Sequence, residues 1–372
     1  MDRGATTTGK ASEPGRGRHP VRVMVVDDSL VARTLLSRII EAEPDFAIVA
    51  KATTGEMAIA RLAETPADVI LLDLEMPGMG GMGALPRILE LARDAKVLVV
   101  SSLTERGAEA TLSALAIGAA DTLLKPRSGE FAEGYARTLV SKIRALAPRR
   151  AVRQAPAAAV PAPRALRPAS RREPQAVAIG ASTGGIHALC ILLGALPRHF
   201  SLPILVVQHL PESFMPTLAR QLALASGRPT SVAGADTPLR PGAILVAPGD
   251  GHMVVRSAAG RLVTGIARYA APSGCTPSVD PLFETLADAT GGRAVGVVLS
   301  GMGRDGLLGA DRLVKAGGML FAQDAATAAV WGMPRAVAEA GLATAILPPE
   351  AIAHRLGSLV SIGASGGEAL RA

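Results

Sequence analysis

The chain has 372 residues, of which 49% are hydrophobic and 2% aromatic, and its formal net charge is +7. This length favours two domains, and the aliphatic content excludes a disordered chain. Two cysteines exclude a disulfide framework, and the polar N-terminus and the absence of a long apolar run predict neither a secretory signal nor membrane insertion. We therefore expect a cytoplasmic protein.

From the N-terminus, the first 20 residues are expected to form a disordered tail, and a domain is expected over residues 21–147. Strand patterns cover residues 21–27, 46–52, 69–72, 97–100 and 122–124, and helical patterns include 30–40 and 108–116. Five strands that alternate with five helices predict a flavodoxin-like, doubly wound parallel sheet.

Residues 148–174 form a basic segment rich in proline and alanine. It holds seven arginines and one glutamate, a balance of +6 out of the total of +7. The two predicted domains are therefore nearly neutral, and nucleic-acid binding is not expected. Two interpretations of the segment stay open: a solvated linker, or a tether weakly attracted to an acidic receptor surface or anionic lipid.

A second α/β pattern covers residues 175–363 and is followed by a short tail over residues 364–372. Its strand patterns are residues 176–179, 204–207, 243–246, 294–299 and 319–322. These runs are aliphatic and are separated by helical patterns, as in a parallel sheet that is buried on both faces. We expect a doubly wound, Rossmann-like domain.

Acidic side chains end two strands of the first domain. Asp27 and Asp28 close the first strand, and Asp73 closes the third. Because the carboxyl ends of parallel strands share one edge, the three carboxylates should converge, and Mg²⁺ is the natural cation to relieve their repulsion. Ser101 and Lys125 end the next two strands and suit phosphoryl oxygens. The alternative for Asp27 or Asp28 alone is helix capping.

This set resembles the response-regulator receiver domains over residues 21–147. The roles that the resemblance implies are phospho-acceptor for Asp73, Mg²⁺ ligands for Asp27, Asp28 and Asp73, switch hydroxyl for Ser101 and phosphate contact for Lys125. A histidine kinase is the implied phosphodonor. Receivers usually carry Asp-Gly where this chain has Gly80-Gly81, so the cap of the helix that begins there should be weaker.

A serine lies in the glycine-rich turn Gly180-Ala181-Ser182-Thr183-Gly184-Gly185, between a strand and a helix. Free N–H groups at the start of that helix suit a developing oxyanion. His209 and Asp305 each follow another strand of the same domain, so the three side chains can meet as a Ser-His-Asp triad. A structural role for each residue is the alternative that the pattern leaves open.

Two further interpretations concern the glycine-rich segments. The turn at Ser182 also fits the nucleophile elbow of α/β-hydrolases, with Asp305 and His354 as partners, although the segment around His354 is typical of a helix interior. Gly301-x-Gly303-x-x-Gly306 with Asp324 fits a dinucleotide fingerprint. That motif comes late in its domain, and the charge of Asp305 inside the loop would repel a pyrophosphate.

Six short motifs of the second domain together resemble the chemotaxis protein-glutamate methylesterases. They are Gly-Ala-Ser-Thr-Gly-Gly at 180–185, Gln-His-Leu-Pro at 208–211, Ala-Pro-Gly-Asp-Gly-His-Met at 247–253, Pro-Ser-Val-Asp at 277–280, Ser-Gly-Met-Gly-Arg-Asp-Gly at 300–306 and Trp-Gly-Met-Pro at 331–334. The resemblance implies a Ser182–His209–Asp305 triad and an oxyanion hole that includes the backbone N–H of Met302. It also implies no cofactor at the esterase site, a methyl-accepting receptor as substrate, and deamidation of glutamines at the same site.

Three further residues lie in or near these motifs. We expect His252 to be structural or to line the substrate site, Asp280 to cap a helix that begins near Pro281, and Cys275 to be an ordinary loop thiol. The receiver is expected to cover the esterase cleft until Asp73 is phosphorylated. A binding protein that is switched by phosphorylation and has lost hydrolysis is the alternative, although retention of all three triad residues argues against it.

Overall fold

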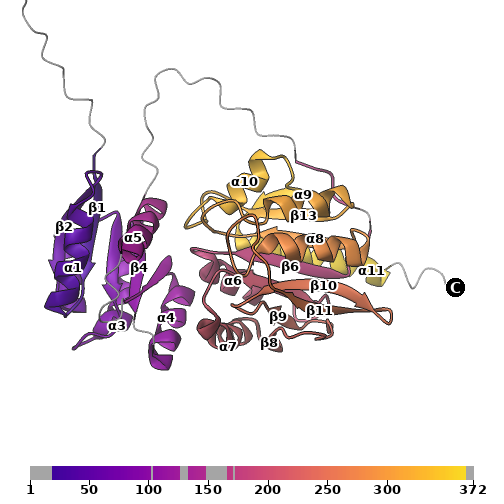
Figure 1. Cartoon of the computed structure of the whole chain (residues 1–372), viewed down its shortest axis with the longest axis horizontal. Coiled ribbons are helices and arrows are strands. Elements are labelled where there is room, and N and C mark those ends of the chain that lie inside the picture. Colours follow the sequence, from indigo (N-terminus) through magenta and orange to yellow (C-terminus); the bar gives the residue numbers. More distant parts are fainter. Residues whose placement is uncertain (1–18, 102–103, 126–132, 148–165, 171, 366–372) are drawn as a thin grey trace, which may run out of the picture.

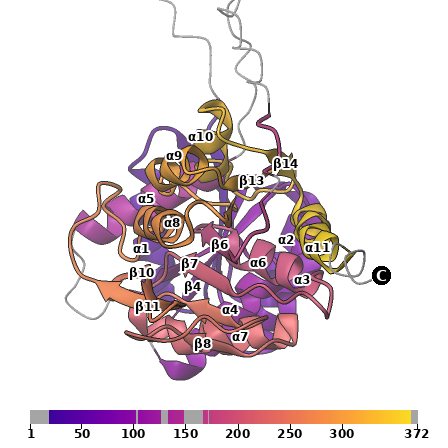
Figure 2. The same ribbon diagram turned by 90° about the vertical axis from the view of Figure 1, so that its right-hand side faces the viewer.

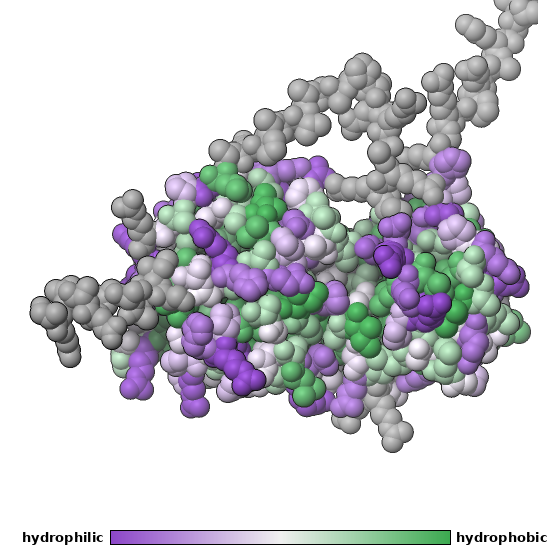
Figure 3. Space-filling view, turned by 180° about the vertical axis from the view of Figure 1, so that it is seen from behind, coloured by the Kyte–Doolittle hydropathy of each residue, from purple (hydrophilic) through white to green (hydrophobic). Residues whose placement is uncertain are grey.

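The computed structural model describes residues 19–101, 104–125, 133–147, 166–170 and 172–365. Most of the predicted N-terminal tail, basic linker and C-terminal tail lies outside these residues. Two α/β units lie side by side, the N-terminal one in indigo to magenta and the C-terminal one in magenta to yellow (Figure 1). Among the described residues, no helix combines the length and the apolar character that a membrane crossing requires. On the face shown in Figure 3, small apolar patches alternate with polar ones.

The N-terminal unit is a parallel five-stranded sheet in the order β2-β1-β3-β4-β5, as predicted. Its strands are β1 Val21–Val26, β2 Phe46–Ala52, β3 Val69–Asp73, β4 Lys96–Ser101 and β5 Asp121–Leu124. Its helices are α1 Leu30–Glu41, α2 Gly55–Glu64, α3 Gly80–Leu91, α4 Glu105–Ile117 and α5 Glu133–Leu146. The aliphatic run of β3 is fully buried, because helices cover both faces of the sheet.

Side chains at the helix starts confirm the expectation for α3. Ser29, Thr54 and Thr104 accept backbone N–H groups at the starts of α1, α2 and α4. The residue before α3 is Met79, whose own side chain makes no cap hydrogen bond, while its N–H donates to the Glu56 carboxylate of α2 at 3.0 Å. The start of α3 therefore lacks a cap from its own N-terminal residue, unlike α1, α2 and α4.

The C-terminal unit is a parallel seven-stranded sheet in the order β14-β13-β12-β6-β7-β9-β8, with a separate antiparallel hairpin of β10 and β11. The strands are β6 Ala176–Ala181, β7 Ile204–Gln208, β8 Thr230–Val232, β9 Ile244–Val246, β10 His252–Ala258, β11 Arg261–Ala267, β12 Ala294–Val298, β13 Met319–Gln323 and β14 Ala345–Leu347. Five of these were predicted. Strands β8 and β14 and the hairpin were not predicted from the sequence.

Helices cover both faces of this sheet (Figure 2). They are α6 Gly185–Gly194, the 3₁₀ turn η1 Glu212–Phe214, α7 Met215–Ser226, α8 Val279–Thr290, α9 Leu307–Lys315, α10 Met333–Glu339 and α11 Pro349–Ser365. Residues of α6, α7 and α11 share one buried cluster, and residues of α8, α9 and α10 share another with β10. The central strand β6 is buried along its whole length, so the residue that follows it leaves the middle of the sheet.

The two units are packed against each other. Helix α4 of the N-terminal unit contacts α6 and α7 of the C-terminal unit, and Leu112 and Leu115 belong to the same buried cluster as Leu189. An ion pair of 2.9 Å between Glu109 and Arg220 lies at the exposed side of this contact. A continuous apolar contact therefore joins the two sheets.

Candidate active site and phosphorylation site

Strand register brings Ser182 and His209 to the same edge of the second sheet. Strands β6 and β7 are parallel and pair Ala181 with Gln208, so the residues that follow them leave neighbouring strands at the same level. The N–H of His209 donates to the carbonyl oxygen of Ala181 at 3.2 Å. This is the convergence at the carboxyl ends of parallel strands that the sequence predicts.

Backbone and side-chain hydrogen bonds fix the turn that carries Ser182. The Ser182 N–H donates to the Ser300 carbonyl at 2.9 Å, and its own carbonyl accepts the Gln208 side-chain amide at 3.0 Å. Gly184 has φ +74°, a conformation that favours glycine. Within the described part of the chain, the Ser182 hydroxyl makes no hydrogen bond. The backbone of the turn is thus fixed, while the hydroxyl is free and half-buried.

The imidazole of His209 is joined to the carboxylate of Asp305, with Nε2 and Oδ2 2.8 Å apart. Asp305 is 3% exposed and accepts two more hydrogen bonds, from the hydroxyl of Ser278 at 2.6 Å and the N–H of Val279 at 2.8 Å. An ionised carboxylate only accepts hydrogen bonds, so Nε2 carries the proton. In the neutral imidazole, Nδ1 is then the nitrogen that accepts a proton.

The pKa values of His209 and Asp305 are shifted in opposite directions. Burial works against the charge of both groups, but the contact between them prevails. The Asp305 pKa is lowered to about 2 by the hydrogen bond and charge of His209, with further donors from Ser278 and Val279. The His209 pKa is raised to about 9 by Asp305 and by the neighbouring Cys275. The carboxylate therefore stays ionised and orients the ring.

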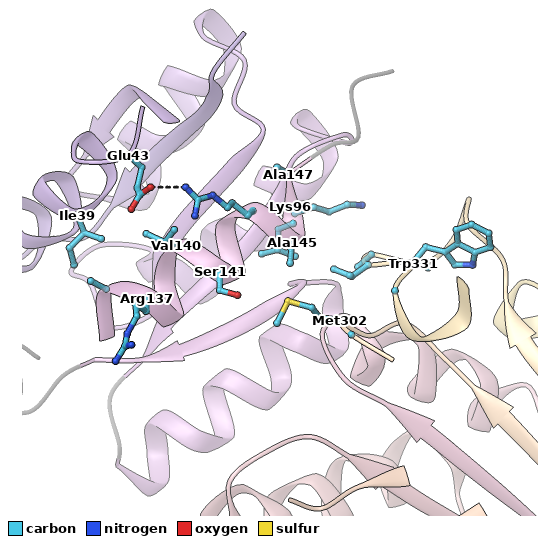
Figure 4. Close-up of a pocket in the computed structure, with 18 of the residues that line it drawn as sticks. Ile39, Glu43, Lys96, Arg137, Val140, Ser141, Ala145, Ala147, Met302 and Trp331 are labelled. Atoms are coloured by element: carbon cyan, nitrogen blue, oxygen red, sulfur yellow. Dashed lines mark hydrogen bonds and ion pairs between the residues drawn. The ribbon is translucent and has the colours of Figure 1, made fainter. Parts of the chain in front are cut away.

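Met302 follows β12 and lines a cavity of about 1290 Å³ between the two units. Figure 4 shows this cavity between Met302 and the loop of Trp331 on one side and α5, with Val140 and Ser141, on the other. The Met302 side chain is 42% exposed, and its backbone N–H meets no acceptor among the described residues. A free N–H at this place suits an anionic oxygen.

His252 and Asp280 both make structural hydrogen bonds, and the role of Asp280 differs from the one expected. His252 is fully buried; its Nε2–H donates to the Tyr269 carbonyl and its Nδ1 accepts the Ser278 N–H. Helix α8 begins at Val279, before Asp280, so the prediction that Asp280 caps this helix was wrong. Its carboxylate accepts the Gly309 N–H at 2.8 Å and thus ties α8 to α9. Burial raises its pKa to about 6, and the charge of nearby Asp305 adds to this.

Cys275 lies beside the imidazole of His209, whereas an ordinary loop thiol was expected. Its sulfur, a His209 nitrogen and an Asp305 oxygen all lie within 4.8 Å of one another. Cys275 is partly exposed, in the loop between β11 and α8. This contact was not predicted from the sequence, because no periodicity predicts where a long loop folds back.

The two alternative interpretations of the glycine-rich segments lose support. His354 is an exposed residue of α11, as its segment predicted, and it offers no partner for a nucleophile elbow. Asp305, inside the Gly301–Gly306 segment, is engaged by His209. An ionised carboxylate at this position opposes the binding of a pyrophosphate there.

The acidic pocket of the first unit lies at the carboxyl edge of its sheet. Oxygens of Asp27, Asp28 and Asp73 lie within 4.8 Å of one another, and Lys125 Nζ is 2.6 Å from Asp73 and 3.2 Å from Asp27. Burial raises the pKa of Asp73, although Lys125 opposes the shift. The Ser101 hydroxyl is 3.4 Å from that of Thr122 and makes no hydrogen bond to the acidic cluster among the described residues.

The residues of this pocket fit a magnesium ion. Oδ2 of Asp27 is buried and makes no hydrogen bond, although Lys125 lies near it. A buried carboxylate oxygen without a hydrogen-bond donor, beside two further carboxylates, is a suitable ligand for a hard divalent cation.

The fold and the two polar clusters define the class of the protein: a response-regulator enzyme with a receiver unit and a hydrolase-type α/β unit. The CheB methylesterase family model matches residues 177–356, and the response regulator receiver domain model matches residues 23–132. Over most of its length the chain is similar to protein-glutamate methylesterase/protein-glutamine glutaminases, and it belongs to this family.

Two relatives and one solved structure illustrate the similarity. Protein-glutamate methylesterase/protein-glutamine glutaminase 2 of Caulobacter vibrioides is 46% identical over 91% of this chain and 98% of its own. The relative from Azospirillum brasilense is 42% identical over 89% and 91%. The crystal structure of the Thermotoga maritima CheB methylesterase catalytic domain is 34% identical, with a TM-score of 0.49, over 50% of this chain and 98% of its own.

Proposed function

We propose that this protein hydrolyses glutamate methyl esters of a methyl-accepting receptor, with Ser182 as nucleophile, His209 as general base and Asp305 as the residue that orients His209. The observation that carries the proposal is the ionised Asp305 bound to His209, one strand away from the free hydroxyl of Ser182. The names of the relatives support methylesterase and glutaminase chemistry at one site.

The proposed reaction is an acyl transfer in two steps. The Ser182 hydroxyl attacks the ester carbonyl while His209 takes its proton, and the backbone N–H of Met302 stabilises the oxyanion. Collapse of the tetrahedral intermediate returns the proton from His209 to the leaving methanol. Water, activated by the same imidazole, then releases the glutamate. With a glutamine as substrate, ammonia leaves in place of methanol.

Methanol release from membranes that carry methylated receptor, with Mg²⁺ and a phosphodonor, tests the assignment. Ser182→Ala should lower the rate about 10⁴-fold or more. Ser358→Ala, at an exposed serine of α11, is the matched control and should keep the parent rate. Turnover that survives in Ser182→Ala would refute the nucleophile assignment. Failure of the parent protein both to release methanol and to react with a fluorophosphonate would favour the pure binding role.

We further propose that Asp73 accepts a phosphoryl group from a histidine kinase. Asp27, Asp28 and Asp73 would hold Mg²⁺, which neutralises charge on the phosphoryl oxygens when bound. Lys125, already in contact with Asp73, would pair with the phosphoryl group, and the hydroxyl of Ser101 would reorient toward it. The esterase site is proposed to need no cofactor.

The proposed partners are therefore a receptor and a kinase, with no role for nucleic acid or for insertion into a membrane. The proposed compartment is the cytoplasm, where thiols stay reduced. Both cysteines, Cys190 and Cys275, are free in the structure, which supports this choice.

Control by the receiver is supported by contacts at the turn of Ser182. The Gly184 N–H donates to the Ala120 carbonyl at 2.6 Å, and the Thr183 hydroxyl donates to the Asp121 carboxylate at 2.7 Å. Both acceptors belong to the receiver, and both donors lie within two residues of Ser182. We propose that this contact limits access to Ser182 until phosphorylation of Asp73 loosens it.

A further inference from the structure

A nitrogen, a sulfur and a carboxylate oxygen converge at the edge of the esterase site. They belong to His209, Cys275 and Asp305, which come from three loops, after β7, before α8 and after β12. Their ligand atoms all lie within 4.8 Å of one another. The proposed reaction uses the histidine and the aspartate and gives the cysteine no role.

We propose that His209, Cys275 and Asp305 form an inhibitory binding site for Zn²⁺. Imidazole, thiolate and carboxylate are the ligand types that zinc takes, and three protein ligands leave a fourth position for water. The receiver pocket offers only oxygens from Asp27, Asp28 and Asp73, which suit Mg²⁺. The described residues thus include two such clusters, one in each unit, with opposite metal preferences.

The ligand atoms need only a small movement to close around the ion. Bond lengths of about 2.0–2.3 Å in a tetrahedral site put ligand atoms about 3.3–3.6 Å apart. Nε2 of His209 and Oδ2 of Asp305, now 2.8 Å apart, would separate by about 0.5 Å as the metal replaces their shared proton. Because the Cys275 sulfur lies within 4.8 Å of the other two ligand atoms, it must approach by at most about 1.5 Å. Its loop is largely exposed, and the thiol also lies 3.8 Å from the Ser273 carbonyl.

The groups behind the aspartate are suited to support a metal ligand. The Ser278 hydroxyl and the Val279 N–H both donate to the Asp305 carboxylate, and the Ser278 N–H is itself fixed by the buried His252. Donors of this kind hold a ligating carboxylate in one orientation and raise metal affinity. Asp305 would therefore enter the metal site already positioned.

Inhibition follows from the role proposed for His209, and in this respect the inference rests on the proposed function. Zinc at Nε2 would break the contact with Asp305 that orients the ring. Zinc at Nδ1 would occupy the lone pair that takes the serine proton. Either mode removes the base, so zinc binding and ester hydrolysis exclude each other.

Binding is tested separately from activity with Co²⁺ as a spectroscopic substitute for zinc. The full chain, with excess Mg²⁺ to fill the receiver pocket, is titrated with Co²⁺ in the near ultraviolet. We expect a thiolate-to-cobalt charge-transfer band that saturates at one ion per chain and is displaced by Zn²⁺. Cys275→Ser should abolish the band. The control Asp28→Asn, which changes only the receiver pocket, should keep it.

Inhibition is tested by methanol release with increasing Zn²⁺, each variant being compared with its own metal-free rate. We expect at least a tenfold loss of rate in the parent chain, reversed by a zinc-selective chelator. Cys275→Ser should raise the half-inhibitory zinc concentration at least about tenfold, because one ligand is lost. The absence of a thiolate band, or equal inhibition of parent and Cys275→Ser, would overturn the site. A band in a chain that never releases methanol would keep the metal site and refute the proposed function instead.

Discussion

Asp305 and Asp280 are buried carboxylates in one small region, and their surroundings shift their pKa values in opposite directions. Burial raises the pKa of Asp280 to about 6, whereas His209 and two further donors hold that of Asp305 near 2. Asp305 is thus ionised at neutral pH and contacts the imidazole directly. Asp280 contacts α9 instead. Their roles in catalysis should therefore separate cleanly in matched variants.

Asp305→Asn should lower methanol release about 10⁴-fold, because the amide carries no charge to stabilise the imidazolium. Asp280→Asn should lower the rate far less, because its amide oxygen still accepts the Gly309 N–H. The measurement is the turnover of both purified variants, with circular dichroism to verify the fold. Equal losses in the two variants would contradict a specific role for Asp305.

The two cysteines should differ in reactivity. Burial raises the pKa of Cys190, in α6, to about 11, while a contact with Gln221 opposes the shift. At pH 8 only about one Cys190 in a thousand is then a thiolate. A disulfide reagent such as 5,5′-dithiobis(2-nitrobenzoate) should therefore titrate one thiol per folded chain at pH 8 and two after unfolding in guanidinium. Cys275→Ser should reduce the count in the folded chain to zero; rapid native labelling of this variant would contradict the burial argument.

Single residues show what the sequence could and could not predict about the site. Ser182, His209 and Asp305 each follow a strand, so topology alone predicted that they lie at one edge of the sheet. His209 and Asp305 are in contact there, whereas the Ser182 hydroxyl makes no hydrogen bond to His209 among the described residues. The position of Cys275 depends on how a surface loop folds back, and that depends on long-range packing. The contact between Asp121 and Thr183 was also missed, because it depends on how two independent sheets dock.

At the scale of elements, the start of α3 shows why one glycine of the Gly80-Gly81 pair is needed. A Cβ on Gly81 would lie 1.9 Å from the carbonyl oxygen of Asp73. Helix α3 therefore packs directly on the end of β3, where the proposed phospho-acceptor lies. A Cβ on Gly83, two residues further along, meets its nearest neighbour, in Met79, at 3.4 Å, an ordinary contact.

Gly81→Ala should force α3 away from β3, destabilise the receiver by about 1–3 kcal/mol and impair phosphorylation. Gly83→Ala is the matched control and should be neutral or stabilise the helix by about 0.5–1 kcal/mol. Incorporation of phosphate from a small-molecule phosphodonor and thermal unfolding measure the two effects. Normal phosphorylation and stability in Gly81→Ala would show that the start of α3 can shift without cost.

The missed elements share a physical reason. Strands β8 and β14 have three residues each and are only partly buried, so they lack the fully buried aliphatic run that made the equally short β9 predictable. The hairpin of β10 and β11 turns at Ala259-Gly260, where both residues have positive φ. Such turns usually carry Asn-Gly or Asp-Gly, so alanine conceals the signal. The long buried strands, in contrast, were predicted within about two residues because their aliphatic runs are continuous.

For the whole molecule, the contact between the units links the two chemistries. The receiver meets the catalytic unit through α4 and through the start of β5, whose Asp121 accepts the Thr183 hydroxyl. The same carboxylate oxygen of Asp121 is 2.6 Å from Lys142 of the receiver's own α5. The Asp121 carboxylate therefore binds both Lys142, within the receiver, and Thr183, the residue next to Ser182 in the catalytic unit.

Asp121→Ala should raise methanol release of the unphosphorylated chain, because the interdomain bond is lost. A buried hydrogen bond to a charged acceptor contributes about 1.5–3 kcal/mol, so the open population should grow at least about tenfold. The rate with a phosphodonor should change little, because that state is already open. Lys142→Met is the control: it breaks the ion pair within the receiver and keeps the acceptor for Thr183, so its unphosphorylated rate should match the parent. An unchanged rate in Asp121→Ala would show that this contact does not restrain Ser182, and an equal rise in both variants would assign the effect to a loosened receiver.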